Sequence, residues 1–135
     1  MGTLQANLGL IQQKIHRAAH RAGRDPDSIE LMAVTKTLEA SAYKVAHAAG
    51  IGLFGENRVQ EAMEKYPKAR DGYRLHLIGH LQRNKAKFVP GFFDCVESID
   101  KLDTANALNR HCETAGCSID ILLEFNTSGE ESKSG

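Results

Sequence analysis

The sequence lacks the biases that mark nucleic-acid-binding and membrane proteins. Its 17 basic residues are balanced by 17 acidic ones, which argues against a partner with a strong negative charge. The apolar runs are far too short for a membrane-spanning helix, and the N-terminus has no signal-peptide core. The three cysteines, an odd number without a Cys-x-x-Cys pair, argue against a disulfide framework. We therefore expect a cytoplasmic chain that folds as one domain over residues 1–135.

The sequence does contain short apolar strands that alternate with helices. Apolar residues spaced three and four apart predict a first helix over 4–22, ended by Gly23 and Pro26. Gly50 and Gly116 are expected to end two later helices, and Asp100 is expected to cap the last one. Strands are predicted at 29–35, 51–54, 74–78, 92–97 and 119–125, and the helices that follow the first four at 39–49, 58–66, 82–89 and 101–115.

This alternation predicts an α/β fold with a parallel sheet, and two architectures remain open. A doubly wound sheet of five strands would be complete at 135 residues. A (β/α)₈ barrel needs about 250 residues, so the chain would supply about half of one. No glycine-rich dinucleotide loop follows the first strand, which disfavours a nucleotide-binding doubly wound sheet.

The segment 31–37 ends its strand on a lysine, Lys36, and then turns towards a helix. A lysine amine held at the rim of a sheet in dry surroundings gives up its proton readily and attacks carbonyl compounds. Taken alone, this lysine is more simply a solvated residue that closes a strand. Other polar residues follow the other strands, where the carboxyl ends of parallel strands form a ligand face: Glu56, Asn57, His80, Gln82, Asn84, Ser98, Asp100, Asn126 and Ser128.

The histidines and cysteines give no metal motif. His76 and His80 are four residues apart, a spacing that brings two ligands to one face only in a helix, whereas 75–78 is predicted to be strand. We therefore predict no metal at this pair. Cys95 lies on an apolar strand and is interpreted as a small packed hydrophobic residue.

Four motifs occur in an order that resembles the pyridoxal phosphate homeostasis protein family. They are Ala-Val-Thr-Lys-Thr at 33–37, Phe-Gly-Glu-Asn-Arg-Val-Gln-Glu at 54–61, His-Leu-Ile-Gly-His-Leu-Gln-Arg-Asn-Lys at 76–85 and Ser-Gly-Glu-Glu-Ser-Lys-Ser-Gly at 128–135. The resemblance implies a fold-type III (β/α)₈ barrel like the N-terminal domain of alanine racemase. It also implies binding of pyridoxal 5′-phosphate (PLP), which the family is thought to store or deliver to apo-enzymes without catalytic turnover.

The resemblance assigns roles to three residues. It implies that Lys36 forms the Schiff base with PLP, that Asn57 lies near the cofactor, and that Lys133 is a secondary contact. We add His80 and Asn126 as cofactor-binding candidates, because both follow predicted strands. Members of the family exceed two hundred residues and bind the phosphate with later strands. We therefore expect this chain to be an N-terminal portion of such a barrel, with weakened cofactor binding.

Two alternatives remain open at this point. The first is a PLP-dependent racemase-like enzyme, which needs a second acid or base, whereas Tyr43, Tyr66 and Tyr73 lie on or just after predicted helices. The second is a cofactor-free half-barrel that forms a homodimer through its two open edges.

Overall fold

The computed structural model describes residues 3–135 and contains one sheet of five parallel strands. The strands follow one another across the sheet in chain order: β1 (Ala33–Val34), β2 (Leu53–Glu56), β3 (Arg74–Leu77), β4 (Cys95–Ile99) and β5 (Asp120–Leu123). Strands β1 and β5 each have a single neighbour, so the sheet is open rather than closed into a barrel. The predicted partial barrel of five parallel strands alternating with helices is therefore confirmed.

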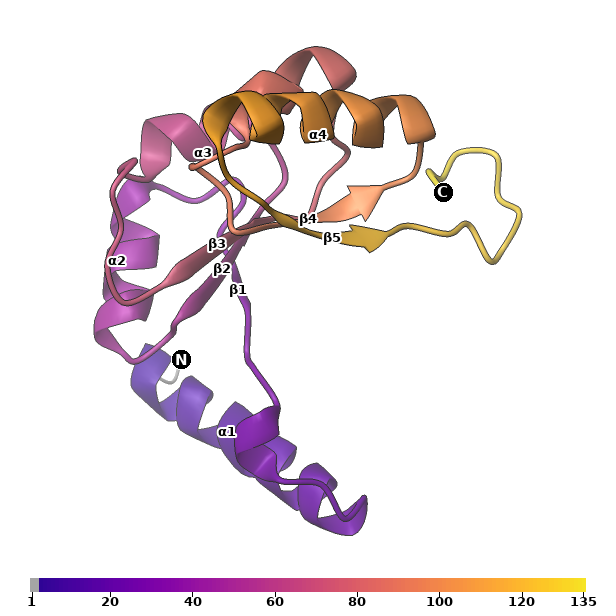
Figure 1. Cartoon of the computed structure of the whole chain (residues 1–135). Helices are drawn as coiled ribbons and strands as arrows, with labels where there is room; N and C mark the ends of the chain where they lie inside the picture. Colours follow the sequence, from indigo (N-terminus) through magenta and orange to yellow (C-terminus); the bar gives the residue numbers. More distant parts are fainter. Residues whose placement is uncertain (1–2) are drawn as a thin grey trace.

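The helices are α1 (Leu4–Arg21), α2 (Ala40–Ala48), α3 (Val59–Lys65) and α4 (Leu102–Ala115), with 3₁₀ turns η1 (Pro26–Ser28) and η2 (Arg83–Phe88). Helix α1 and η1 precede β1, whereas α2, α3, η2 and α4 connect successive strands along the convex side of the curved sheet (Figure 1). The Thr3 hydroxyl caps α1 by accepting the Ala6 N–H, and Gly116 ends α4 in the left-handed conformation that glycine adopts easily. Among residues 3–135, no helix combines the length and apolar character needed to cross a membrane.

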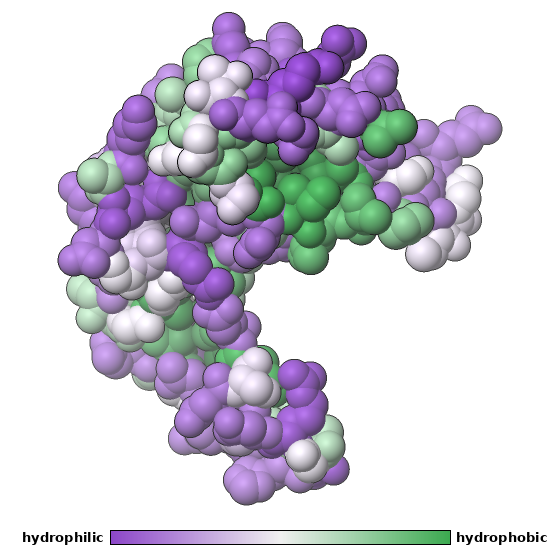
Figure 2. Space-filling model, in the orientation of Figure 1, coloured by the Kyte–Doolittle hydropathy of each residue, from purple (hydrophilic) through white to green (hydrophobic). Residues whose placement is uncertain are grey.

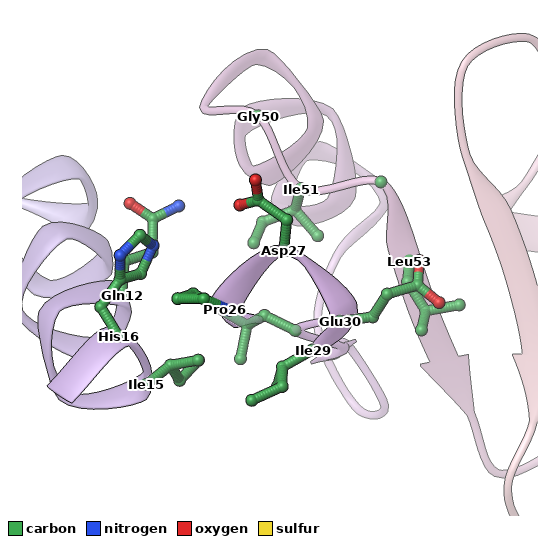
Figure 3. A pocket seen from close by; sticks show the side chains of 12 residues that line it. Gln12, Ile15, His16, Pro26, Asp27, Ile29, Glu30, Gly50, Ile51 and Leu53 are labelled. Carbon is green, nitrogen blue, oxygen red and sulfur yellow. The ribbon is translucent and has the colours of Figure 1, made fainter. Parts of the chain in front are cut away.

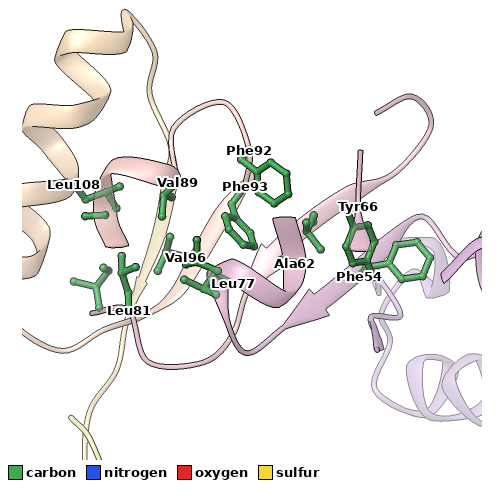
Figure 4. Close-up of a cluster of buried hydrophobic side chains, with 14 of the residues drawn as sticks. Phe54, Ala62, Tyr66, Leu77, Leu81, Val89, Phe92, Phe93, Val96 and Leu108 are labelled. Atoms are coloured by element: carbon green, nitrogen blue, oxygen red, sulfur yellow. The ribbon is translucent and has the colours of Figure 1, made fainter. Parts of the chain in front are cut away.

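The hydrophobic core fills the space between these helices and the convex face of the sheet (Figure 4). Phe54, Leu75, Leu77 and Val96 are fully buried there, because alternate residues of a strand point to the same face. The other strand positions face the concave side, where Figure 2 shows a broad hollow in the molecule. Among residues 3–135, no helix covers the concave face of the sheet (Figure 1).

All five strands begin or end at other residues than predicted, and the differences are largest at β1, β2 and β4. Strand β1 is limited to Ala33 and Val34, which pair with Phe54 and Gly55 of β2. Because β2 begins only at Leu53, most of the predicted residues 29–32 have no partner strand beside them. Strand β2 continues through Glu56, which was predicted to lie in the following loop. Strand β4 starts later than predicted because Phe92 and Phe93 form a turn after η2, with their N–H groups bonded to the Val89 carbonyl.

The predicted cap of the fourth helix is also wrong. Lys101 is the residue that precedes the first turn of α4, and its side chain forms no capping hydrogen bond. Asp100 lies one residue earlier and turns its carboxylate towards His80. Asp100 therefore belongs to the carboxyl edge of the sheet rather than to the helix.

Candidate functional site

Lys36 follows β1 directly and lies in a tight turn. The turn is closed by the Leu38 N–H, which donates to the Thr35 carbonyl at 3.1 Å. Thr37 has a φ of 62°, in the left-handed region that a β-branched residue rarely enters. The Lys36 side chain is exposed, so the dry surroundings expected from the sequence are not provided by residues 3–135. What the turn provides is a fixed backbone position for an accessible amine.

A buried polar network anchors this turn from the helix side of the sheet. The Lys65 ammonium donates to the Thr35 carbonyl at 2.7 Å and to Glu56 Oε1 at 2.8 Å. The Thr35 hydroxyl donates to the same Glu56 oxygen at 2.7 Å. The Glu56 side chain is fully buried and that of Lys65 is 8% exposed. Since Thr35 precedes Lys36, the network holds the strand end from which the lysine emerges.

Tyr66 completes the network. Its phenol oxygen lies 2.5 Å from the Thr35 hydroxyl oxygen, and because the Thr35 proton goes to Glu56, Tyr66 is the donor in this contact. Burial raises the pKa of the Tyr66 phenol, and the Glu56 carboxylate raises it further, so the phenol keeps its proton. Neither Lys65 nor Tyr66 was predicted to belong to the site. A lysine at the end of an amphipathic helix normally reaches solvent, and Tyr66 was placed on or just after a predicted helix.

The carboxyl ends of β2 and β3 form a second part of the site. An open pocket of about 520 Å³ lies here and brings together two of the predicted residues, Asn57 and His80. Most of its remaining lining is polar, and Arg58 and Lys85 add positive charge that suits an anionic group. The complete lining is Asn57, Arg58, Val59, Gln60, Gly79, His80, Gln82 and Lys85.

Close backbone contact fixes the two loops of this pocket against each other. A Cβ added at Gly79 would overlap the carbonyl oxygen and Cα of Asn57, so only glycine fits at this position. The Gly79 carbonyl in turn accepts a hydrogen bond from the Ser98 hydroxyl at 2.6 Å. The loops after β2 and β3 are therefore held against each other and against strand β4.

His80 is exposed at this edge and lies above a buried carboxylate. Its Nδ1 is 3.8 Å from Asp100 Oδ2, and the Asp100 side chain is only 5% exposed. The other carboxylate oxygen, Oδ1, is buried without a hydrogen-bond partner among residues 3–135. An unpaired buried oxygen is unusual in a folded protein and marks this corner as one shaped for a polar contact.

The remaining two predicted residues lie beyond β5, the strand at the opposite edge of the sheet from β1. The Asn126 side chain is used within its own loop, where Nδ2 donates to the Glu130 carbonyl at 2.9 Å and Oδ1 accepts the Gly129 N–H at 3.0 Å. Lys133 is exposed in the segment that follows. The predicted residues are thus spread over three parts of the sheet edge.

Another pocket lies at the amino-terminal end of the strands, opposite the carboxyl edge that carries Lys36. It measures about 270 Å³ and is enclosed by α1, η1 and the residues that lead into β1 and β2 (Figure 3). Its lining includes His16, Asp27 and Leu53, which precede the carboxyl ends of the strands. This pocket is therefore separate from Lys36.

Comparison with known families gives a match over almost the whole chain. The family described as the alanine racemase N-terminal domain matches residues 6–135. The chain belongs to this family. The resemblance predicted from the four motifs is confirmed, and so is the barrel-type architecture.

Individual relatives carry more specific names. The pyridoxal phosphate homeostasis protein of Pseudomonas aeruginosa is 40% identical over 136 residues, which is 100% of this chain and 59% of that protein. An unknown protein from Bifidobacterium adolescentis has a crystal structure with a TM-score of 0.85 and 35% identity, covering 97% of this chain and 58% of that one.

PipY of Synechococcus elongatus, solved with PLP bound, has a TM-score of 0.73 and 36% identity. The match covers 85% of this chain and 55% of PipY. The chain thus spans less than two thirds of the length of each of these relatives.

Proposed function

We propose that this chain binds PLP through a Schiff base on Lys36 and acts in cofactor homeostasis, by storage or by delivery to apo-enzymes. The supporting observation is an exposed amine held in a fixed turn at the carboxyl edge of β1, on a fold shared with PipY, which has been solved with PLP bound. A relative from Pseudomonas aeruginosa that is 40% identical to this chain is named pyridoxal phosphate homeostasis protein.

The chemistry needs an amine and a reversible bond. PLP supplies an aldehyde, to which a neutral lysine amine adds with the loss of one water. Because hydrolysis reverses this bond, it suits a protein that holds and releases its ligand. The chain contributes a fixed position for the amine, since Lys65 and Leu38 both hold the Thr35 carbonyl.

The other candidate residues have supporting roles in this proposal. Asn57 and His80 border the pocket that also contains Arg58 and Lys85, and this polar, positive surface is complementary to an anionic cofactor. Asn126 and Lys133 would approach the ligand from the β5 edge. We further propose that residues 1–135 are part of a single cytoplasmic PLP-binding barrel, in which further strands bind the phosphate group of the cofactor.

An enzyme that moves a proton on an amino acid needs a second acid or base beside the cofactor. All three tyrosines pack around Phe54 on the helix side of the sheet, with ring centroids 5.4 to 6.2 Å from it. The relatives are also named for homeostasis rather than for a reaction. We therefore propose binding without turnover.

A titration with PLP tests this function. Addition of PLP to the chain is expected to produce an absorbance band near the edge of the visible range that disappears on reduction with borohydride. Lys36→Ala should abolish the band, whereas Lys44→Ala, which removes an exposed lysine of α2, should leave it unchanged. A band of equal strength in both variants would contradict the role of Lys36.

For residues 1–135 by themselves, without a further strand on β5, we make a second proposal, that two copies associate through this edge. The outer backbone groups of β5 pair with no strand among residues 3–135. This edge strand also exposes apolar side chains: Ile121 is 41% exposed, Leu122 55% and Leu123 61%. Figure 2 shows apolar side chains gathered on the inner side of the molecule.

Light scattering tests this association. We expect a dimer that Leu122→Lys converts to a monomer, because a charge on this strand would have to be buried between two copies. An exposed leucine of α1, Leu10, provides a matched control as Leu10→Lys. A monomer at micromolar concentration in the unmodified chain would overturn the proposal.

A further inference from the structure

Three side chains on the concave face of the sheet combine the donor atoms of a metal site. They come from two neighbouring strands: His76 on β3 pairs in register with Cys95 on β4, and Glu97 follows Cys95 by two residues on the same face. One ligand atom of each lies within 4.8 Å of the others. His76 Nδ1 and Glu97 Oε1 are only 2.6 Å apart.

The cluster is largely buried but still accessible to solvent. The His76 and Glu97 side chains are 13% and 27% exposed, and Cys95 is 6% exposed. Their neighbours Leu75, Leu77 and Val96 point the other way into the core, so the strands hold the three ligands on one side. A small cation can reach them from the concave side, and rigid strands limit how far they can move apart.

Acidic groups outnumber basic ones around Cys95, which faces the carboxylates of Glu97, Asp120 and Asp94 and the Arg74 guanidinium. Glu97 and Asp120, the register partner of Cys95 on β5, supply two carboxylates. Among residues 3–135, neither carboxylate forms an ion pair with a lysine or arginine; the sole partner of Glu97 is His76. A divalent cation would neutralise this charge directly.

We propose that His76, Cys95 and Glu97 bind a divalent transition metal, with Zn²⁺ as the ion that fits best. One imidazole nitrogen, one thiolate and one carboxylate form the mixed donor set that Zn²⁺ accepts, and three protein ligands leave the fourth tetrahedral position to water. Tetrahedral ligands lie about 3.3 to 3.7 Å apart, so closure around the ion needs only small side-chain rotations.

Binding changes the protonation of two ligands. The Cys95 thiol releases its proton to solvent as the metal–sulfur bond forms, and the neutral His76 imidazole binds the metal through one nitrogen and carries its single proton on the other. The hydrogen bond between His76 and Glu97 is then replaced by two bonds to the same ion. The bound ion therefore links β3 to β4. This site is independent of the proposed chemistry at Lys36, because Lys36 follows β1 and β2 separates β1 from β3.

Cobalt titration of the metal-stripped, PLP-free chain tests the site, since Co²⁺ reports its ligands by absorbance. We expect one Co²⁺ per chain, a near-ultraviolet band from sulfur bound to cobalt, the intense visible bands of tetrahedral Co²⁺, and displacement by Zn²⁺. Cys95→Ser should abolish the sulfur band, and Glu97→Gln should weaken the affinity at least tenfold.

The control is Cys117→Ser, which removes an exposed thiol outside the cluster and should leave cobalt binding unchanged. Circular dichroism of each variant shows whether it is folded, and the partly exposed Glu97 gives a variant that leaves the core intact. A sulfur band retained in Cys95→Ser, a band lost in Cys117→Ser, or an affinity unaffected by Glu97→Gln would each overturn the proposal.

Discussion

Thr37 carries the most unusual backbone conformation next to the candidate site. It is the one residue other than glycine with a positive φ within 3–135, and it directly follows Lys36. A β-branched side chain in the left-handed region costs about 1 to 3 kcal/mol, which the rest of the fold must offset. The turn therefore keeps its shape at the expense of stability, as is common where a functional side chain must be placed.

We expect Thr37→Gly to stabilise the chain by about 0.5 to 1 kcal/mol, because glycine adopts this φ without strain but loses more entropy on folding. Thr37→Ala keeps the strain and should change the free energy of unfolding by less than about 0.5 kcal/mol. Urea unfolding of both variants gives the comparison. A less stable Thr37→Gly variant would show that the turn is not strained.

At the scale of elements, the Thr35–Glu56–Lys65–Tyr66 network connects β1, β2 and α3. Its ion pair is buried, with Glu56 fully inaccessible and Glu56 Oε2 unpaired among residues 3–135. A buried pair adds little net stability, but removal of one partner leaves an isolated charge. Its function here is to fix the strand end that carries Lys36.

Lys65→Met should therefore destabilise the chain by about 3 to 5 kcal/mol, since it leaves the Glu56 carboxylate without a counter-charge. The double variant Lys65→Met, Glu56→Gln should recover a large part of this loss. The exposed pair between Arg58 and Glu61 provides the control, and Arg58→Ala should cost less than about 1 kcal/mol. Equal losses for Lys65→Met and Arg58→Ala in urea unfolding would contradict the account.

The aromatic cluster between α2, α3 and the sheet predicts a dependence on alkaline pH. Burial raises the pKa of the Tyr73 phenol to about 12, whereas an unfolded tyrosine titrates near 10. Between about pH 10 and 12 the unfolded state releases its proton while the folded state keeps it, so stability falls as pH rises.

Tyr73→Phe should make this alkaline decline shallower. It should also preserve or slightly raise stability at pH 7, because the Tyr73 hydroxyl is buried without a partner among residues 3–135. Thermal or urea unfolding from pH 8 to 12 measures both effects. Parallel curves for the two proteins would show that Tyr73 does not contribute.

At the scale of the whole molecule, periodicity predicted the five strands, the four α-helices and the parallel sheet, because strand and helix repeats are local properties of the sequence. A further predicted helix, at 82–89, is instead the 3₁₀ turn η2. It missed strand ends that depend on a neighbour, as at β1, where pairing with β2 decides which residues are in the sheet. The four motifs, rather than periodicity, decided between a doubly wound sheet and a barrel.

Part of the candidate site was predictable from the sequence, namely the residues that directly follow strands. Lys36, Asn57 and His80 follow strands, and this position is visible in the sequence. Glu56 was assigned to a loop, and Lys65 escaped notice, because their burial depends on contacts between β2 and α3 that no local pattern encodes. The same limit applies to His76, Cys95 and Glu97, which strand pairing alone brings together.

The central claim, that Lys36 holds PLP covalently, is tested most directly by the intact mass of the chain after incubation with PLP and reduction with borohydride. We expect the mass of one reduced adduct, located by peptide mapping on the peptide that contains Lys36. The adduct should be absent from Lys36→Ala and present in full in Lys44→Ala. An adduct spread over several lysines, or undiminished in Lys36→Ala, would contradict the proposed function.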